Sequence, residues 1–348
     1  IIFMLDAFDS STFTKLLNIN PTYNDILEDF TYYPDTMAGY PFTELSIPFI
    51  LSGKWYENER PFSEYQNDVF SNSYLFENLD ALGYEISLYD KDAIPQNDVS
   101  LRFANIKYGK SRFDSFLEYL RIQYNLVGFK YAPWFIKKTF DVDTSKFDAL
   151  AFVSNTSSQF DWQTHVFYTG MLHQEVQIES EKHFKFIHLE GAHVPYRYDK
   201  EVHVIENGTY EGNVSACVTV IDRYLNKLKD AGVYDNSVII IMSDHGYNAD
   251  GGTEGRQNPF FAVKGKGEKK AFKISNHPFS YEDLPALYND LLEGKQTSEI
   301  PILTRTSKKA RRFLFYYYLE EDHMYEYLQK GKADNLDTLV PTGNEYIR

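Results

Sequence analysis

Residues 231–246 read AGVYDNSVIIIMSDHG and contain the strongest strand signal in the chain. The apolar run 238–242 follows a polar turn and is itself followed by Ser-Asp-His-Gly. A short apolar run between turn residues is typical of a buried strand. The residues before it, 214–229, have the apolar spacing of an amphipathic helix. A helix that leads into a buried strand indicates an α/β fold.

The same alternation of strands and helices continues through most of the chain, and predicts a central, largely parallel sheet flanked by helices. Further strands are predicted at residues 1–5, 84–88, 184–189 and 260–263. Further helices are predicted at residues 23–30, 43–51, 71–82, 113–126 and 281–292.

The domain organisation is predicted from changes in composition along the chain. We expect one catalytic domain over residues 1–300, in which the aromatic-rich stretch 90–180 forms substrate-shaping insertions. After Pro301, a basic cluster at 308–312 precedes the aromatic run 313–318. These residues predict a small C-terminal subdomain over 301–348 that contributes edge strands.

Composition excludes several classes of function. The 348 residues carry 35 Lys and Arg against 50 Asp and Glu, a net charge of −15. This acidity argues against a nucleic-acid partner, because phosphate backbones select basic surfaces. Hydrophobic residues make up 43% of the chain, which is typical of a folded globular protein. The single cysteine, Cys217, excludes an intrachain disulfide and any metal site built from several cysteines.

The N-terminal end predicts that this sequence is part of a longer chain. It starts inside a predicted strand, without an initiator Met and without the pattern of a signal peptide. No apolar run approaches the roughly 20 residues of a membrane helix. We therefore expect an ectodomain or catalytic fragment, with any membrane anchor in a segment upstream of Ile1.

Polar groups that could bind a metal follow three of the predicted strands. Asp6 follows the first strand, Asp244 and His245 follow the strand 238–242, and His193 lies shortly after the strand 184–189. Ligands of open α/β sheets bind where parallel strands end. Asp6, Asp244 and His245 would suit a divalent cation. Taken one by one, each Asp is more often a turn or cap residue and His193 more often a structural imidazole, so it is their shared location that indicates a site.

Thr43 is the candidate nucleophile. It lies at the predicted start of the helix 43–51, where unpaired N–H groups and the helix dipole favour an alkoxide and a bound phosphate. A metal bound to its oxygen would lower the pKa of the hydroxyl further. On the local segment alone, Thr43 as an ordinary N-cap is the simpler explanation.

Together these motifs resemble the sulfatase-like branch of the alkaline phosphatase superfamily. The segment Thr-Glu-Leu-Ser-Ile-Pro at 43–48 is similar to that of membrane-anchored phosphoethanolamine transferases and lipoteichoic acid synthases. The block 214–246 is very similar to the one these families carry before their metal ligands. Residues 254–259 resemble the E-G-x-R-x-P segment of sulfatases, and 283–285 their D-L-P helix start. The matches keep the family order from residue 1 to about 292 and are weakest over 90–180.

The resemblance implies a fold and a site. It implies an alkaline phosphatase-like core and one divalent ion, Mn²⁺ or Zn²⁺, with Mg²⁺ or Ca²⁺ also compatible. Asp6, Thr43, Asp244 and His245 would hold the ion, and Thr43 would attack a phosphoester to give a phosphothreonine. His193 would contact the phosphoryl oxygens or protonate the leaving group. Arg256 would bind the transferring group.

Two departures from the family patterns narrow the choice. Sulfatases use a cysteine or serine that is converted to formylglycine, whereas Thr43 stands at that place here. We therefore do not expect sulfate-ester hydrolysis by the formylglycine mechanism of sulfatases. Asp6 is followed by Ala7 rather than a second Asp, and the chain lacks the disulfides usual in phosphoethanolamine transferases. Both points favour the lipoteichoic acid synthase type.

Three functions remain open at this stage. The first is transfer of a phosphoglycerol- or phosphoethanolamine-type group from a phospholipid to a glycan or lipid acceptor. The second is hydrolysis of phosphoesters at the same site, and the third is a degenerate binding protein without activity. For the transferase we expect a location on the extracytoplasmic face of a bacterial cell membrane. A naturally longer chain with several membrane segments would favour transfer, and a cleavable signal alone would favour hydrolysis.

Overall fold

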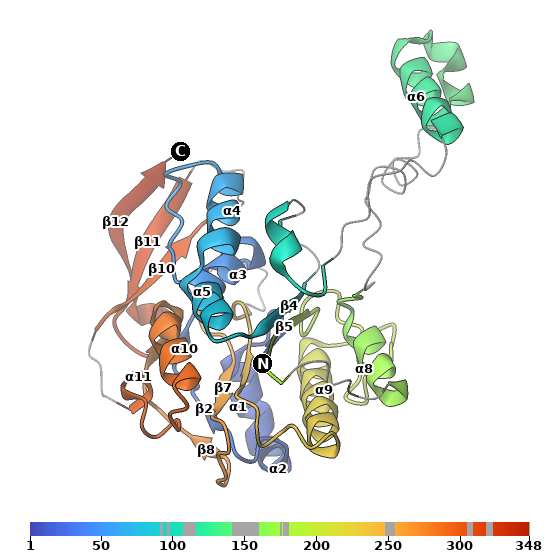
Figure 1. Cartoon of the computed structure of the whole chain (residues 1–348). Coiled ribbons are helices and arrows are strands. Elements are labelled where there is room, and N and C mark those ends of the chain that lie inside the picture. Colours follow the sequence, from blue (N-terminus) through green and yellow to red (C-terminus); the bar gives the residue numbers. More distant parts are fainter. Residues whose placement is uncertain are drawn as a thin grey trace. The chain divides into compact units, whose positions relative to one another are not determined.

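The computed structural model describes residues 1–90, 93–95, 98–106, 116–140, 160–174, 176, 181–247, 255–304, 309–317 and 323–347 (Figure 1). The chain divides into two compact units. The first contains Ile1–Phe103 and Phe160–Arg348, and the second is Ala104–Gln159. The domain boundary expected near residue 300 stays a prediction, because this division does not test it.

A mixed, mostly parallel sheet forms the centre of the first unit, as the sequence predicts. Its strand order is β4-β5-β1-β6-β7-β2-β8. β1 pairs in parallel with both β5 and β6, and β4 pairs in parallel with β5. β7 runs antiparallel to β6 and to β2. The strands are β1 Ile2–Leu5, β2 Thr31–Tyr32, β4 Glu85–Tyr89, β5 His183–Leu189, β6 Ile239–Met242, β7 Phe261–Lys264 and β8 Lys273–Ile274.

Helices cover both faces of this sheet, with α9 and α10 on opposite sides (Figure 1). The helices of the first unit are α1 Ser10–Ile19, α2 Tyr23–Ile26, α3 Thr43–Ser52, α4 Phe62–Asn72, α5 Tyr74–Ala81, α8 Thr164–His173, α9 Tyr210–Asp230, α10 Leu284–Leu292 and α11 Pro301–Thr304. Short 3₁₀ turns are η1 Asp98–Arg102, η3 Tyr281–Asp283 and η4 Leu336–Thr338. In the second unit, α6 Phe116–Tyr131 is followed by the 3₁₀ turn η2 Trp134–Thr139.

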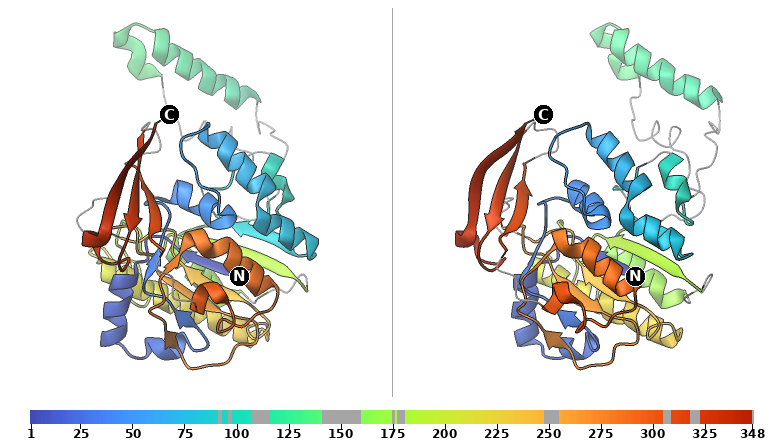
Figure 2. Two further views of the ribbon diagram at one scale, coloured as in Figure 1. Left: turned by 90° about the vertical axis from the view of Figure 1, so that its left-hand side faces the viewer. Right: turned by 60° about the vertical axis from the view of Figure 1, so that its left-hand side comes forward.

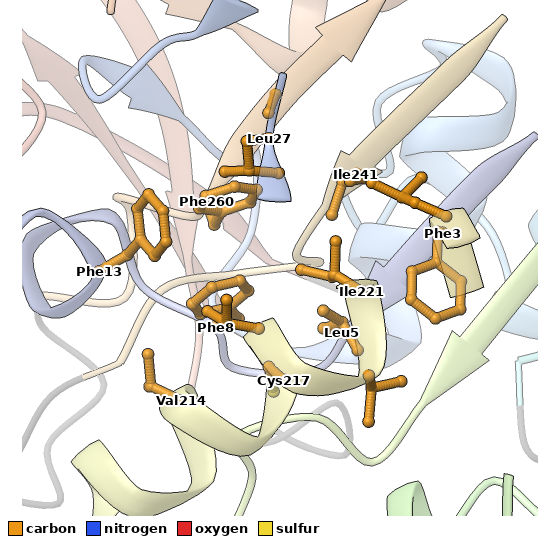
Figure 3. Close-up of a cluster of buried hydrophobic side chains, with 14 of the residues drawn as sticks. Phe3, Leu5, Phe8, Phe13, Leu27, Val214, Cys217, Ile221, Ile241 and Phe260 are labelled. Atoms are coloured by element: carbon orange, nitrogen blue, oxygen red, sulfur yellow. The ribbon is translucent and has the colours of Figure 1, made fainter. Parts of the chain in front are cut away.

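The core between α9 and the sheet explains why α9 forms. Thr209 caps its N-terminus by accepting a hydrogen bond from the Gly212 amide at 3.0 Å. Its apolar face, including Val214 and Cys217, packs on β1 and the loop after β1 (Figure 3). Phe3 of β1 belongs to this cluster, and burying one such side chain contributes about 1.5–3 kcal/mol.

Five predicted helices differ from the structure in their bounds by more than one residue. The helix expected at 214–229 is α9, which already starts at Tyr210, and the helix expected at 281–292 is α10, which starts at Leu284 after the turn η3. The helix expected at 23–30 is only the single turn α2, because Asp29 takes a left-handed φ of 74° and its amide bonds to Lys270 O at 2.9 Å. The helix expected at 71–82 starts at Tyr74, since Ser73 is extended and separates α4 from α5. The helix expected at 113–126 is α6, of which residues 113–115 lie outside the described residues.

The helix α1 is not among those predicted from the sequence, although its signals are present. Asp9 accepts hydrogen bonds from the amides of Ser11 and Thr12, as an N-cap residue does. Phe13 and Leu17 then come at helical spacing and are buried.

The C-terminal strands form a sheet of their own. β10 Arg311–Phe315, β11 His323–Gln329 and β12 Leu339–Ile347 are antiparallel neighbours (red in Figure 2). The expectation that they extend the edge of the central sheet was therefore wrong. β3 Thr36–Met37 and β9 Phe279–Ser280 form a further two-stranded sheet.

Candidate metal centre and nucleophile

The register of the central strands brings the first predicted ligands together. Met4 of β1 lies beside Met242 of β6, so that Asp6 and Asp244 each lie two residues beyond a paired position. β5 and β6 flank β1 on its two sides, and all three strands are parallel. Their carboxyl ends therefore meet at one edge of the sheet, where ligands of such sheets bind.

Asp6, Asp244 and His245 form one compact, buried cluster. One ligand atom from each lies within 4.8 Å of the others. His245 Nε2 is 3.6 Å from Asp6 Oδ1 and 3.4 Å from Asp244 Oδ2. Their exposed fractions are 4%, 0% and 2%. Asp6 Oδ1 is buried and has no hydrogen-bond partner within the described part of the chain.

The hydrogen bond of His245 Nδ1 determines the tautomer of the ring, and with it whether Nε2 faces the carboxylates with a proton or with a lone pair. Nδ1 lies 2.7 Å from Gly246 O. A carbonyl only accepts hydrogen bonds, so Nδ1 carries the proton and the neutral ring turns the lone pair of Nε2 toward Asp6 and Asp244. Burial lowers the pKa of His245, which favours this neutral form.

The pKa values of the two carboxyls move in opposite directions. Burial raises the pKa of Asp6 well above its usual range, and the charge of Asp244 raises it further. Burial also raises the pKa of Asp244, but the neighbouring imidazoles of His245 and His188 and the hydrogen bonds from Thr43 and the Ala7 amide lower it more, to about 2. The cluster thus contains one carboxylate that stays ionised and one that ionises with difficulty.

This arrangement fits a divalent cation. Two carboxylate oxygens and one imidazole lone pair converge, and no donor among the described residues supplies a hydrogen bond to Asp6 Oδ1. Lone pairs that face one another in a buried site are stabilised by a cation, and oxygen with imidazole ligands suits Mn²⁺, Zn²⁺ and Mg²⁺ alike. The residues therefore fit the ion, but they do not identify it.

Thr43 reaches the cluster from the start of α3. Its hydroxyl donates a hydrogen bond of 2.7 Å to Asp244 Oδ2. The N-cap position belongs to Phe42, which makes no side-chain cap hydrogen bond. Thr43 is thus not the N-cap residue that the local segment suggests, and its half-buried hydroxyl points at the candidate metal ligands.

Arg256 lies against the residue next to Thr43. Its guanidinium is 4.8 Å from the centre of the Phe42 ring, a cation–π arrangement. No hydrogen bond or ion pair joins this guanidinium to any other described residue, and its buried Nε has no partner there. Its charge also lowers the pKa of His245. A guanidinium that has no partner among the described residues and lies against Phe42, the residue before Thr43, suits an anionic group. Glu254, which opens the predicted E-G-x-R-x-P segment, lies outside the described residues.

His193 lies after β5 at the same sheet edge and is half-buried. Its Nδ1 is 2.6 Å from Val194 O, which again leaves Nε2 as the free nitrogen. Its charge lowers the pKa of His245, although His193 is not one of the three clustered ligands. The structure therefore brings His193 near the centre without making it a ligand of the Asp6–Asp244–His245 cluster.

Sequence reasoning missed two residues that hold the site in place. Ser243 Oγ donates to His245 O at 2.7 Å and accepts from the Phe8 amide at 2.9 Å, which ties the loop after β6 to the loop after β1. Gly191 has φ 59°, and a Cβ there would lie 2.5 Å from the Asp6 amide nitrogen. Only glycine permits this approach, and the Gly in E-G-A-H was the available signal.

A comparison with known families identifies the chain. The sulfatase family model matches residues 1–286. The chain belongs to the sulfatase family. A comparison with curated proteins gave no match. The fold is that of the alkaline phosphatase superfamily, to which sulfatases belong, as the motifs predicted.

Solved structures agree with this fold at low sequence identity. Ps i-CgsB, solved in complex with k-i-k-neocarrahexaose, is 15% identical, with a TM-score of 0.57 over 94% of this chain and 81% of that chain. An alkaline phosphatase superfamily protein from Vibrio parahaemolyticus is 16% identical, with a TM-score of 0.53 over 99% and 77%. A phosphonate monoester hydrolase from Silicibacter pomeroyi is 12% identical, with a TM-score of 0.51 over 98% and 87%.

Members of this superfamily act as hydrolases or transferases on phosphate or sulfate esters, and they generally use a divalent metal. Among the described residues, no helix is both long and apolar enough to cross a membrane.

Proposed function

We propose that the chain is a metal-dependent phosphotransferase with Thr43 as its nucleophile. The donor is a phospholipid with a phosphoglycerol- or phosphoethanolamine-type head group, and the acceptor is a hydroxyl of a glycan or lipid. The observation that carries the proposal is the 2.7 Å hydrogen bond from the Thr43 hydroxyl to Asp244 Oδ2, inside a buried cluster of metal-binding groups.

The first step forms a bond between Thr43 Oγ and the phosphorus and breaks the ester bond to the lipid. The hydroxyl proton leaves along the hydrogen bond to Asp244 Oδ2, which orients the oxygen lone pair toward the substrate. Asp6, Asp244, His245 and Thr43 Oγ would hold the ion. When bound, the ion would supply positive charge that lowers the pKa of the Thr43 hydroxyl and neutralises phosphoryl oxygens.

His193 and Arg256 have complementary roles in this step. The free Nε2 of His193, when protonated, donates a proton to the departing lipid alkoxide. The Arg256 guanidinium, stacked on Phe42, binds an oxygen of the transferring phosphoryl group. In the second step an acceptor hydroxyl attacks the phosphorus of the phosphothreonine, and His193 removes its proton. The bond between Thr43 Oγ and the phosphorus breaks, and the proton held by Asp244 returns to the Thr43 oxygen.

The thiol of Cys217 and the hydroxyl of Ser46 are poor alternatives to Thr43 as the nucleophile. Cys217 is fully buried between α9 and the sheet, and burial raises the pKa of its thiol (Figure 3). Ser46 lies in α3, the helix that starts at Thr43. It is buried, and its hydroxyl donates to Tyr40 O at 3.2 Å. This supports a phosphoester substrate and argues against the formylglycine chemistry of most sulfatases.

Hydrolysis is the second candidate, because the same phosphothreonine could be attacked by water. The half-buried position of Thr43 leaves its site accessible to solvent. Of the solved structures with a similar fold, the one from Silicibacter pomeroyi is described as a phosphonate monoester hydrolase.

For the phospholipid transferase, we further propose a location at the extracytoplasmic face of a bacterial membrane, reached through a segment outside this sequence.

Mass spectrometry of the peptide that contains Thr43 tests the proposal. The Mn²⁺- or Zn²⁺-loaded protein is incubated with vesicles of phosphatidylglycerol or phosphatidylethanolamine and then digested. We expect a phospho-adduct on Thr43 whose mass identifies the head group. Ser46→Ala, a change in the same helix, should retain the adduct, and Thr43→Ala should lose both adduct and turnover.

The outcomes distinguish the candidates. Release of the head group to water without a lasting adduct, still dependent on Thr43, would support hydrolysis. Turnover by Thr43→Ala at the rate of the parent would refute Thr43 as nucleophile. If the parent chain shows neither turnover nor metal binding, the remaining explanation is a binding protein without activity.

A further inference from the structure

The second unit, taken by itself, carries a group of large apolar side chains on its surface. The exposed fractions are 73% for Tyr131, 82% for Trp134 and 68% for Phe135. Tyr131 ends α6, and Trp134 and Phe135 open the turn η2 directly after it. Single exposed apolar residues are ordinary, but neighbouring aromatic residues exposed to this extent mark an interaction surface.

Basic residues lie on the same stretch. Lys130 Nζ is 5.3 Å from the centre of the Tyr131 ring, and Lys137 Nζ is 5.5 Å from the centre of the Phe129 ring. Lys138 beside them is exposed. Residues 116–140 contain four basic residues and one acidic residue, a net charge of +3 in a chain whose net charge is −15. Positive charge is thus concentrated where the exposed rings are.

We propose that this aromatic–lysine surface, formed by Lys130, Tyr131, Trp134, Phe135, Lys137 and Lys138, docks on anionic phospholipid membranes. Trp and Tyr prefer the boundary between water and acyl chains. Lysines beside them keep their charge at the level of the lipid phosphates while their alkyl stems lie on apolar surface. Both features are expected of a segment that lies in the interface plane.

Two alternatives fit the surface less well. α6 has 16 residues, fewer than the roughly 20 that cross a bilayer, so the segment lies on the membrane and does not span it. The core of an interface between two protein copies is depleted of charged residues, especially lysine. Here Lys130 lies over the Tyr131 ring and Lys137 over the Phe129 ring, and two copies with the same positive charge at this surface would repel.

This inference goes beyond the proposed transfer reaction and stands without it. Docking on a bilayer depends on the second unit alone, whereas the reaction depends on Thr43 and the metal cluster. If the transfer reaction also holds, docking would raise the local concentration of the enzyme at its lipid donor.

Vesicle co-sedimentation of the full chain tests the docking surface. The vesicles contain either equal parts of phosphatidylglycerol and phosphatidylcholine or phosphatidylcholine alone. We expect binding to the anionic vesicles that weakens as salt is added. A double variant, Trp134→Ser with Phe135→Ser, should bind at least roughly tenfold more weakly. Lys137→Gln with Lys138→Gln should bind roughly thirtyfold more weakly, because each lysine near an anionic surface adds to the affinity.

Matched changes on the first unit serve as controls. Ile19→Ser with Leu336→Ser replaces two exposed apolar residues elsewhere, and Lys200→Gln with Lys266→Gln removes two exposed lysines. Both controls should bind vesicles like the parent. The fluorescence of Trp134 should shift to the blue on binding, and the shift should be absent in Trp134→Phe.

Several outcomes would overturn the inference. One is a parent chain that does not bind anionic vesicles at any lipid concentration. Another is equal loss of binding in the control variants, which would mean a non-specific effect. A concentration-dependent dimer that the Trp134→Ser, Phe135→Ser variant abolishes, without vesicle binding, would assign the surface to a second copy of the chain. Loss of turnover in Thr43→Ala with normal vesicle binding would leave the inference intact.

Discussion

Replacing Asp6 by Asn should change the stability of the protein in opposite directions with and without metal. The ligand atoms of Asp6 and Asp244 lie within 4.8 Å of each other. Two unit charges at that distance repel by about 3.5 kcal/mol at an effective dielectric constant of about 20. The metal-free protein relieves part of this repulsion by keeping Asp6 protonated, as its raised pKa indicates. We therefore expect Asp6→Asn to raise the free energy of unfolding of the metal-free protein.

The expected size is about 2 kcal/mol, which for a chain of this length raises the Tm by roughly 3 °C. With metal bound, we expect the parent to be more stable than Asp6→Asn. At about 100 times its Kd, a bound ion adds about 2.7 kcal/mol to the stability of the parent. Asp6→Asn removes an anionic ligand and should lose most of that gain. Differential scanning fluorimetry in EDTA, and then with Mn²⁺, Zn²⁺ or Mg²⁺, measures both effects.

Glu190→Gln is the matched control for this experiment. Glu190 lies just beyond β5 at the same sheet edge and is equally buried. It accepts a hydrogen bond of 2.6 Å from Arg197 Nη2 and another from the Tyr198 hydroxyl. Its replacement should lower the Tm with and without metal and leave the metal-induced increase unchanged. If Asp6→Asn behaves like Glu190→Gln, Asp6 is a structural carboxylate and the assignment of the metal site is wrong.

The pH dependence of the metal-free protein gives a second readout of the same interaction. A carboxyl whose pKa is raised on folding binds more protons in the folded state, so its contribution to stability is lost as the pH rises above about 4. Asp244, with a pKa of about 2, acts in the opposite sense, and its contribution is lost as the pH falls from about 4 toward 2. His245 and Asp244 titrate in both proteins, so the parent curve minus the Asp6→Asn curve reports Asp6 together with its interaction with these two neighbours. A flat difference above pH 4 would contradict the raised pKa.

Three further substitutions test other parts of the site. Gly191→Ala should lower the unfolding free energy by about 1–3 kcal/mol and weaken metal binding, because its Cβ would collide with the Asp6 amide. Gly232→Ala, with a similar φ of 70° and open space around its Cβ, should leave metal binding unchanged in a calorimetric titration. Cys217→Ala should leave turnover per folded molecule unchanged, and a stable variant without turnover would implicate the thiol. Tyr316→Ala should lower kcat while Tyr316→Phe retains it, because the ring rather than the hydroxyl packs on Phe42; equal kcat values would refute this role.

The sheet and the metal cluster could be predicted because both arise from local signals. The apolar runs that became β1 and β6 have turn residues after them, and parallel pairing places the residues after both strands at one edge of the sheet. Asp6, Asp244 and His245 therefore converge without knowledge of the loops. The resemblance of residues 283–285 to a D-L-P helix start also agrees with the structure, in which Asp283 takes the cap position ahead of Leu284 and Pro285, although the helix itself was predicted from residue 281.

Features that depend on contacts distant in sequence could not be predicted. Ser73 ends α4 because its hydroxyl, which is fully buried, bonds to Leu51 O. Nothing in the segment 71–82 indicates that contact. The same limit applies to β10, whose strand pattern was recognised but whose partner was not. Leu314 of β10 donates to Gly39 O at 2.9 Å, which holds the C-terminal sheet beside the loop that leads into α3.

The orientation of Thr43 depends on long-range contacts in a way that bears on function. Its own segment favours an N-cap, yet the structure gives that position to Phe42 in an extended conformation. The Phe42 ring lies 4.8 Å from the Arg256 guanidinium and 5.3 Å from the centre of the Tyr316 ring, and both neighbours are far away in sequence. These two contacts keep Phe42 at the N-cap position, where its side chain makes no cap hydrogen bond. Thr43 is then the first residue of the helix, and its hydroxyl bonds to Asp244 and does not cap the helix.

Forgoing a polar N-cap costs a helix about 1 kcal/mol. α3 bears this cost at its positively polarised N-terminal end, where Phe42 supplies no side-chain cap. The Arg256 guanidinium, which has no partner among the described residues, lies against the Phe42 ring at this end. An ordinary structural helix would be expected to have a polar cap, whereas a helix end that receives a phosphoryl group is better without one. Tyr316, the residue directly after β10 of the C-terminal sheet, helps to hold Phe42 in the cap position. A region that composition predicts to be an accessory subdomain therefore contributes directly to the geometry of the proposed nucleophile.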